Sequence, residues 1–499
     1  MRLTTAQRER AAGVLVGQAC GDALGVPYEF GSPPRDGRPE MLGGGLGNYA
    51  PGEWSDDTQM AMCIAEVAAT GIDLTTAEAL DAIAGRFEEW LAGSPGDVGI
   101  QTRTVLTLAR SLPGSPSERL REAARQVHHR TGRSAGNGAL MRTSPVALAY
   151  LDRPAELAQA ARAIAELTHY DPLAGDACVL WSDAIQQAVT TGEGFLLDLE
   201  LIPTERRDYW AGLIADALEG SPRDFNPNGD TMRAFQAALA VMVGASDAVP
   251  DPVRKGLTSA VLAGHDTDTV AAIAGGLLGG LRGLGAVPAE WVTAVHGWPG
   301  RRGHDLVRTA LAIADPEVGR WPDIDRVDHV TARPLAVPLP FDDDVLIGTL
   351  ADLDRVDELG VSAVVTLCRI GRDQVAPGAV RPERHAQLWL VDSDDPDDNP
   401  NLYAVLTDAA RLTRSWRDEG HRVLIHCVAA QRRAPSAALA YAGAAGAEVD
   451  EAARGIPHLY PGVNATARLW RAAADVAREL AAEAKHCQSS MDQYEWKGR

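Results

Sequence analysis

Hydrophobic and polar positions follow a helical period over the first 315 residues. Ala and Leu side chains recur there every three to four residues, and runs of β-branched residues are few. This spacing is typical of amphipathic helices. The pattern predicts an all-α domain over residues 1–315, with helices at 75–92, 116–128, 154–168, 176–190, 205–218 and 231–243.

Gly and Pro interrupt the helical pattern in bursts, and most of the unusual polar residues lie in these same segments. The bursts occupy residues 21–54, 93–99, 132–145 and 264–285. Because binding and catalytic side chains concentrate in loops held by a rigid scaffold, we expect the functional site of this domain in these segments.

The pattern changes after residue 315. Residues 316–340 are rich in Pro without helical spacing, which predicts a linker. Short apolar runs then alternate with helical stretches at 351–359 and 401–418, which predicts an α/β domain over 341–475 with a mainly parallel sheet. Its strands are expected at 345–348, 361–368, 387–391 and 422–426. A long helix at 464–484 is expected to end in a polar tail, so that 476–499 forms the helix end and tail.

Composition and charge limit the classes of partner. Among 499 residues, 68 acidic side chains outnumber 47 basic ones, which gives a net charge of −21 and argues against an extended nucleic-acid groove. Six cysteines without a C-x-x-C pair argue against a disulfide framework. No run of eighteen apolar residues and no secretory leader is present, so the expectation is a cytoplasmic protein with no membrane partner.

Two short segments concentrate carboxylates. Residues 53–58 are Glu-Trp-Ser-Asp-Asp-Thr, and residues 264–269 are Gly-His-Asp-Thr-Asp-Thr; each precedes an apolar helical segment. Such residues could cap helices, because their side chains accept hydrogen bonds from backbone N–H groups. Doubled carboxylates repel one another unless a cation or proton lies between them, which favours a hard metal ion with oxygen ligands. The residues alone leave both interpretations open.

Five ordered motifs within residues 6–312 resemble those of the ADP-ribosylglycohydrolase family. They are Gly21-Asp-Ala-Leu-Gly-Val-Pro-Tyr-Glu29, Trp54-Ser-Asp-Asp-Thr58, Pro95-Gly-Asp-Val-Gly99, Gly136-Asn-Gly-Ala-Leu-Met-Arg142 and Asp266-Thr-Asp-Thr269. The resemblance implies an all-α fold with a binuclear Mg or Mn centre. It places metal ligands at Ser55, Asp56, Asp57, Asp266, Asp268 and Thr269.

The same resemblance implies roles for other residues. Asp97 would lie near the ribose and move a proton or stabilise the developing cation, and Glu29 would face the metals. Substrate contacts are expected from Gly136, Asn137, Gly138, Met141, Arg142 and His169. Two positions depart from the family pattern: Ser55 replaces a common Thr and keeps its hydroxyl, and His265 replaces a Gly beside Asp266.

A cysteine follows the last predicted strand, in His426-Cys427-Val-Ala-Ala-Gln-Arg-Arg433. A thiolate at a strand-to-helix turn is stabilised by loop N–H groups, and an Arg six residues later can bind the same anion. Residues 340–475 are similar to the dual-specificity phosphatases. The similarity implies Cys427 as nucleophile, Arg433 as phosphate binder and His426 as a residue that lowers the pKa of Cys427. It also implies an Asp general acid, for which Asp392 is the match and Asp394 and Asp395 are neighbours.

Two departures weaken the phosphatase pattern. Ala430 replaces the loop Gly at a position that favours positive φ, and Ala434 replaces a hydroxyl residue. We therefore predict a metal-dependent hydrolase that releases ADP-ribose from an acceptor, with a phosphatase-like domain whose substrate would be phosphorylated. The alternative is a sensor that binds ADP-ribose and phosphate, in which the phosphatase-like domain is inactive.

Overall fold

The structure is a computed structural model that describes residues 2–194, 196–246, 251–315, 324–329 and 332–496. Its internal contacts divide the chain into two units. One comprises Met1–Val287 and Ala294–Gly319, and the other comprises Pro288–Thr293 and Arg320–Arg499. Of the predicted linker, residues 316–323 and 330–331 lie outside the described residues, and strand β3 begins at Val337 within the predicted range.

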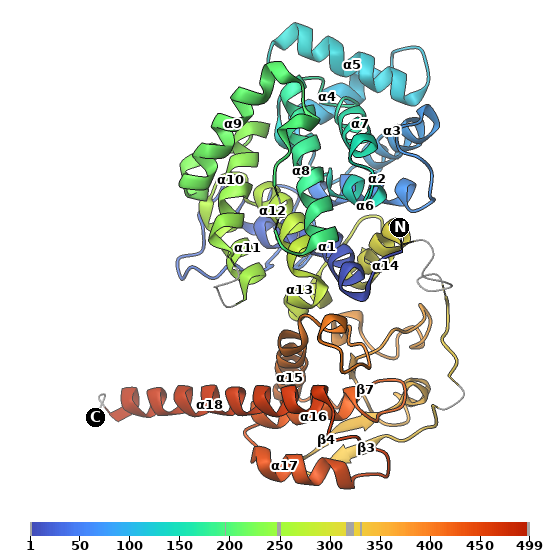
Figure 1. Cartoon of the computed structure of the whole chain (residues 1–499), viewed down its shortest axis with the longest axis vertical. Helices are drawn as coiled ribbons and strands as arrows, with labels where there is room; N and C mark the ends of the chain where they lie inside the picture. Colours follow the sequence, from blue (N-terminus) through green and yellow to red (C-terminus); the bar gives the residue numbers. More distant parts are fainter. Residues whose placement is uncertain (1, 195, 247–250, 316–323, 330–331, 497–499) are drawn as a thin grey trace. The chain divides into compact units, whose positions relative to one another are not determined.

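Helices form nearly all of the regular structure described in the first unit (Figure 1). A two-stranded antiparallel pair, β1 (His296–Gly297) with β2 (Arg301–Arg302), is an addition to the all-α expectation. The α-helices are α1 (Thr5–Gly25), α2 (Asp56–Ala68), α3 (Ala77–Ala92), α4 (Ile100–Ala109), α5 (Pro116–Thr131), α6 (Ser144–Ala149), α7 (Pro154–Ala165), α8 (Pro172–Thr191), α9 (Thr204–Glu219), α10 (Thr231–Gly244), α11 (Pro252–Ala263), α12 (Thr267–Arg282), α13 (Ala289–Ala294), which crosses the boundary between the units, and α14 (Gly303–Ala314).

A stripe of glycines brings α1 against α12 along their length. Gly13, Gly17, Gly21 and Gly25 recur every four residues on one face of α1. A Cβ atom at Gly17 would lie 2.3 Å from the carbonyl oxygen of Gly275, and one at Gly25 would lie 2.4 Å from the Cα of Asp268. Only glycine allows the two backbones to approach this closely, so the stripe fixes α1 beside the start of α12.

The second unit contains a five-stranded sheet in the order β3-β4-β7-β5-β6. Three of its four pairings are parallel, and only β3–β4 is antiparallel, as expected for a mainly parallel sheet. Its elements are β3 (Val337–Leu339), β4 (Asp342–Gly348), the 3-10 helix η6 (Leu350–Arg355), β5 (Ala363–Thr366), β6 (His385–Gln387), α15 (Leu402–Asp418), β7 (Val423–His426), α16 (Arg433–Ala444), α17 (Val449–Gly455) and α18 (Arg468–Trp496).

Three expected elements of this unit differ in the structure. The helix predicted at 351–359 is instead η6, where the buried Asp352 carboxylate accepts a hydrogen bond from Thr349 N at 2.8 Å and tightens the turn. The strand predicted at 387–391 is wrong in extent, because β6 covers His385–Gln387 and shares only Gln387 with it; farther on, Val391 N donates to Asn399 Oδ1 at 2.9 Å instead of to a strand. Helix α18 continues to Trp496 because neither Gly nor Pro interrupts residues 485–496.

Candidate active site

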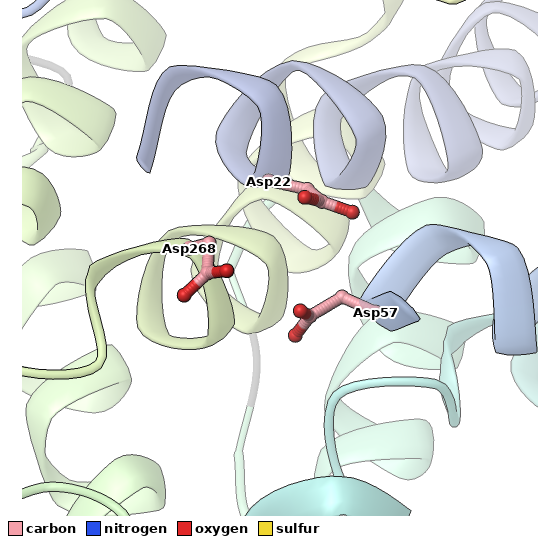
Figure 2. Close-up of side chains that lie close together, drawn as sticks. All are labelled: Asp22, Asp57 and Asp268. Atoms are coloured by element: carbon pink, nitrogen blue, oxygen red, sulfur yellow. The ribbon is translucent and has the colours of Figure 1, made fainter. Parts of the chain in front are cut away.

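Three helices from distant parts of the chain bring three buried carboxylates together. Asp22 comes from α1, Asp57 from the first turn of α2 and Asp268 from the first turn of α12, and Figure 2 shows their side chains converging. One oxygen atom of each lies within 4.8 Å of the others. A second group, Glu29, Asp266 and Asp268, meets the same distance criterion. Asp268 thus belongs to two adjoining acidic groups.

Asp22 holds the start of α2. Its Oδ1 accepts hydrogen bonds from Ser55 N at 2.8 Å and Ser55 Oγ at 2.7 Å, and its Oδ2 accepts one from Thr58 N at 2.9 Å. Ser55 is the N-cap residue of α2, yet its side chain makes no capping hydrogen bond. A carboxylate from α1 therefore does the capping, which leaves the acidic residues of α2 available for another purpose.

The Ser55 hydroxyl lies between two carboxylates. Its Oγ is 2.7 Å from Asp22 Oδ1 and 2.9 Å from Asp57 Oδ2. A hydroxyl has one proton to donate, so both contacts are favourable only if a carboxyl is protonated or a cation is bound nearby. Asp57 Oδ1 is buried and has no hydrogen-bond partner among the described residues.

Burial and mutual repulsion favour the protonated form of these carboxyl groups. Desolvation is the largest cause in each case. Neighbouring carboxylates add to it for Glu29, Asp56, Asp57 and Asp268, whereas hydrogen bonds from Ser55 and Thr58 partly offset it for Asp22. The pKa of Asp22 is raised to about 6, that of Asp56 to about 7 and that of Glu29 to about 8. The pKa values of Asp57 and Asp268 are raised well above the usual range.

These observations fit a divalent metal ion. The available donors are carboxylate and hydroxyl oxygens, which hard cations such as Mg²⁺ and Mn²⁺ prefer. A bound cation would also supply the partner that Asp57 Oδ1 lacks and offset the repulsion that raises the pKa values. Capping accounts for the hydrogen bonds of Asp22 but explains neither the orphaned oxygen of Asp57 nor the buried Asp268 beside it, so the metal interpretation is the better supported of the two.

A pocket of about 380 Å³ adjoins the carboxylates. This volume lies within the usual range of small-molecule sites. Among the residues predicted from the sequence, those that line the pocket are Glu29, Asp56, Asp97, Gly136, Asn137, Gly138, Met141, His169, Asp266, Asp268 and Thr269.

The glycine loop of the pocket also supports a carboxylate. Asn137 Nδ2 donates a hydrogen bond to Asp266 Oδ2 at 2.8 Å, and so orients that side chain. A Cβ atom at Gly138 would lie 3.1 Å from the ring of His169, so glycine lets the loop approach the imidazole. Burial lowers the pKa of His169 to about 3, and the ring is therefore neutral near pH 7.

Arg142 differs from the other residues expected to contact substrate. Its side chain is completely buried, does not line the pocket, and lies 4.5 Å from the centre of the Phe87 ring. It donates a hydrogen bond to Thr168 Oγ1 at 2.6 Å, and that oxygen is 2.8 Å from His169 Nδ1. Arg142 therefore acts on the pocket through Thr168 and His169.

Sequence reasoning did not assign two residues of this site. Asp22 belongs to the quoted Gly21–Glu29 motif, and its isolated charge inside an apolar helix was the available signal. Asn228 precedes α10, and its Oδ1 accepts a hydrogen bond from Asp266 N at 2.9 Å. No sequence pattern around Asn228 distinguished it from an ordinary turn residue.

The second unit places Cys427 and Arg433 at the two ends of one loop. Cys427 follows β7 and is buried, and Arg433 begins α16. The Arg433 guanidinium donates from one terminal nitrogen to the carbonyl oxygens of Leu367 at 3.2 Å and Leu390 at 3.1 Å. Ala430 has φ of +57°, the conformation expected for the missing glycine.

The three candidate acids beside this loop have different surroundings. Asp392 Oδ2 is 3.9 Å from Arg433 Nε, and Asp392 Oδ1 is 3.0 Å from Arg432. Asp394 pairs with Arg432 and accepts a hydrogen bond from Arg468 N at 2.8 Å, which lowers its pKa. Asp395 binds the backbone N of Asp397 at 3.0 Å. Of the three, Asp392 makes the contact with Arg433.

His426 is buried before the cysteine. Its Nε2 lies 2.7 Å from Thr366 Oγ1, and burial lowers the pKa of the imidazole to about 4. The ring is therefore uncharged near neutral pH and brings no positive charge toward Cys427.

Known proteins resemble this chain over its first part. Residues 3–321 match the sequence model of the ADP-ribosylglycohydrolase family. The ADP-ribosyl-dinitrogen reductase glycohydrolase of Rhodospirillum rubrum is 29% identical over 61% of this chain and 97% of its own length. The ADP-ribosylarginine hydrolase Tri1 of Pseudomonas putida (strain GB-1) is 30% identical over 64% of this chain and 81% of its own.

A solved mouse putative dual specificity phosphatase covers 32% of this chain and 95% of its own, at 18% identity and a TM-score of 0.25. This likeness is too weak to assign the second unit, whose phosphatase activity stays a prediction.

Within the described ranges, no helix has both the length and the apolar character needed to span a membrane.

Proposed function

This chain belongs to the ADP-ribosylglycohydrolase family, and on that premise we propose that its helical unit hydrolyses the bond between ADP-ribose and an acceptor. The observation that carries the proposal is the meeting of acidic groups from α1, α2 and α12 beside one pocket. Hydrolases of glycosidic bonds use paired carboxyl groups to move protons while positive charge develops at the anomeric carbon.

We assign two divalent cations, Mg²⁺ or Mn²⁺, to the ligands Ser55, Asp56, Asp57, Asp266, Asp268 and Thr269. When bound, such cations orient the ribose hydroxyls and lower the pKa of water. Asp22 has a different role: both of its oxygens already accept hydrogen bonds, so it positions Ser55 and the start of α2.

Two further groups of pocket residues have roles in the proposed reaction. The loop Gly136–Gly138 binds substrate, and Asp97 and Glu29 move protons. Backbone N–H groups of Gly136–Gly138 would donate to the phosphate oxygens, since glycine permits close approach of an anion. In the reaction, a water oxygen bonds to the anomeric carbon, the bond to the acceptor breaks, and the acceptor takes a proton. We propose that Asp97 accepts the proton of the water and that Glu29, whose pKa is raised to about 8, gives the acceptor its proton.

The test is release of ADP-ribose from an ADP-ribosylated protein by the purified full chain with Mg²⁺ or Mn²⁺. We expect Asp56→Asn and Asp268→Asn each to reduce kcat by at least about 100-fold, and to weaken Mn²⁺ binding measured by calorimetry. Asp208→Asn, on the exposed side of α9, is the matched control and should behave as wild type. Equal turnover by the double variant Asp56→Asn/Asp268→Asn would refute the assignment.

A second activity is proposed for the other unit on the arrangement of Cys427 and Arg433. The Cys427 thiolate would attack a phosphate monoester, form an S–P bond and expel an alcohol that takes a proton from Asp392; water would then hydrolyse the S–P bond. Hydrogen bonds to the carbonyl oxygens of Leu367 and Leu390 hold the Arg433 guanidinium at this loop, where its positive charge favours anion binding. Ala430 and Ala434 favour the competing possibility, a loop that binds phosphate without turnover.

Hydrolysis of an aryl phosphate separates these two possibilities. Retained catalysis predicts turnover that is abolished by Cys427→Ser and strongly reduced by Arg433→Lys. Arg414→Lys, at a position of α15 where the side chain is 45% exposed, is the control for the second variant. Absence of turnover, together with binding of inorganic phosphate by wild type but not by Arg433→Lys, would support the binding role.

A further inference from the structure

Three large apolar side chains are exposed around the pocket. Phe30 is 61% exposed, Leu46 is 59% exposed and Ile100 is 88% exposed, and all three line the pocket. We call them the apolar rim. Exposed apolar side chains that gather at one place on a protein usually mark a binding surface. Here they gather at the pocket that holds the acidic groups.

The backbone around the rim is built to display these residues. Phe30 has φ of +48°, a strained conformation for an aromatic residue, and its N–H donates to the carbonyl oxygen of His265 at 2.7 Å. Leu46 follows three glycines with positive φ, a turn closed by reciprocal 2.8 Å hydrogen bonds between Gly44 and Tyr49. Both segments are therefore held by hydrogen bonds in conformations that leave the apolar side chains exposed.

Close backbone contacts place Leu46 between the other two rim segments. A Cβ atom at Gly45 would lie 2.6 Å from the carbonyl oxygen of Val26, four residues before Phe30. A Cβ atom at Gly96 would lie 2.7 Å from the carbonyl oxygen of Gly47, and Gly96 is four residues before Ile100. The glycine turn thus contacts both the Glu29 segment and the Asp97 loop, and the rim runs across three adjoining segments.

The charge of the pocket limits the class of acceptor that the apolar rim can contact. Among the described residues that line it are the carboxylates of Glu29, Asp56, Asp97, Asp266 and Asp268, and none is Lys or Arg. A nucleic-acid acceptor would bring the phosphates of its own backbone, beyond those of ADP-ribose, to a pocket lining that offers no Lys or Arg to bind them. A free small acceptor would leave the rim exposed to water. A protein surface with apolar side chains matches the rim in both respects.

We propose that Phe30, Leu46 and Ile100 determine specificity by contacting apolar side chains that flank the modified residue of a protein acceptor. This inference rests on the proposed glycohydrolase function of the same pocket. Since the acceptor leaves the pocket through its mouth, residues next to the modified one must lie against the rim. The rim then adds affinity for a modified protein but none for a modified free amino acid.

The experiment compares two substrates that share one linkage, an ADP-ribosylated protein and the same ADP-ribosylated amino acid. For the variant Phe30→Ser/Leu46→Ser/Ile100→Ser, we expect kcat/KM on the protein to fall by about 30-fold, mainly through KM, as three apolar contacts are lost. On the amino acid it should fall less than about threefold. The matched control is Leu196→Ser/Leu218→Ser/Val243→Ser, three exposed apolar residues that do not line the pocket.

Three results would overturn the inference. An equal loss on both substrates, or a comparable loss of affinity for ADP-ribose in calorimetry, would mean that the rim contacts the ADP-ribose itself, for example by stacking of Phe30 on the base. An unchanged kcat/KM on the protein would mean that the rim makes no contact. Wild-type protein that is inactive on both substrates would refute the glycohydrolase function, and the rim proposal with it.

Discussion

Replacing Asp56 by Asn should stabilise the metal-free protein and remove most of its response to metal. Asp56 is only 7% exposed, and its pKa is raised to about 7 by burial, with further increases from Asp97 and Asp22. A carboxyl whose pKa rises from about 4 in the unfolded chain to about 7 in the fold costs about 4 kcal/mol once both states are ionised.

The sign of the effect follows from linkage. A raised pKa means that between about pH 4 and pH 7 the folded state holds a proton that the unfolded state has released, so stability falls as the pH rises from about 4 to about 7 and levels off above that. We therefore expect the Tm advantage of Asp56→Asn over wild type to be near zero at pH 4.5 and to reach about 6 °C at pH 8 in chelator. Saturating Mn²⁺ should reverse the order, because the cation stabilises wild type and binds the variant weakly.

The assay is thermal unfolding of the full chain, followed by circular dichroism at 222 nm, which reports mainly the helical unit, from pH 4.5 to 8 in chelator and in Mn²⁺. Comparing variant with wild type at each pH cancels the titration of groups distant from Asp56. Glu29 and Asp57, whose pKa values the Asp56 charge raises, change in the variant and add to the same trend. Asp208→Asn, at an exposed position on α9, should differ from wild type under neither condition. A Tm difference between Asp56→Asn and wild type that does not change with pH would show that Asp56 is not a strained buried carboxylate and would refute the reasoning.

Three further changes test other contacts. Gly17→Ala should lower the free energy of unfolding of the helical unit by about 3 kcal/mol in chemical unfolding, because the new Cβ would lie 2.3 Å from the Gly275 carbonyl oxygen and force α1 away from α12. Gly85→Ala, at a position where no atom lies within 4 Å of the new Cβ, is the control and should not destabilise the unit. Asn137→Ala removes the donor to Asp266 Oδ2 and should weaken Mn²⁺ binding by about 10-fold in calorimetry, while unchanged affinity would contradict its positioning role. His265→Gly should raise the free energy of unfolding by about 1 kcal/mol in chemical unfolding, since the exposed His265 has φ of +62° and the hydrogen bond from Phe30 N to its carbonyl oxygen is retained. A loss of stability would show that the His265 side chain makes a necessary contact.

The positions of helices could be predicted from the sequence where the capping residues agreed with the hydrophobic periodicity. Helix α5 begins as predicted at Pro116, after the Ser115 capping box with Glu118. It ends at Thr131, three residues beyond the predicted end, before the C-cap residue Gly132, which has φ of +61°. The shorter elements of the second unit were less accessible. The extents of η6 and β6 depend on side-chain hydrogen bonds of Asp352 and Asn399, and such contacts leave no periodic pattern in the sequence.

The acidic clusters were visible in the sequence because their carboxylates are doubled, although the pattern left capping and metal binding open and the set of metal ligands came from the family resemblance. Asp56 and Asp57 are adjacent in sequence, and Asp266 and Asp268 are two residues apart, so each pair draws attention without a structure. What the sequence did not supply was the role of single residues. Arg142 is part of a quoted motif, yet it is buried against Phe87, and this role depends on how α3 packs.

The glycine stripe explains why Asp22 could not be assigned from its own neighbourhood. Its contacts are with Ser55 and Thr58, more than thirty residues away, and Asp268 lies still further along the chain. The periodic glycines Gly13, Gly17, Gly21 and Gly25 let α1 approach α12 within backbone contact, and this approach brings Asp22 next to Asp268. A pattern normally associated with helix packing is thus also a determinant of the acidic site. It follows that a substitution in the stripe far from the pocket, such as Gly17→Ala, should impair metal binding as well as stability, since the carboxylates are placed by the distance between two backbones.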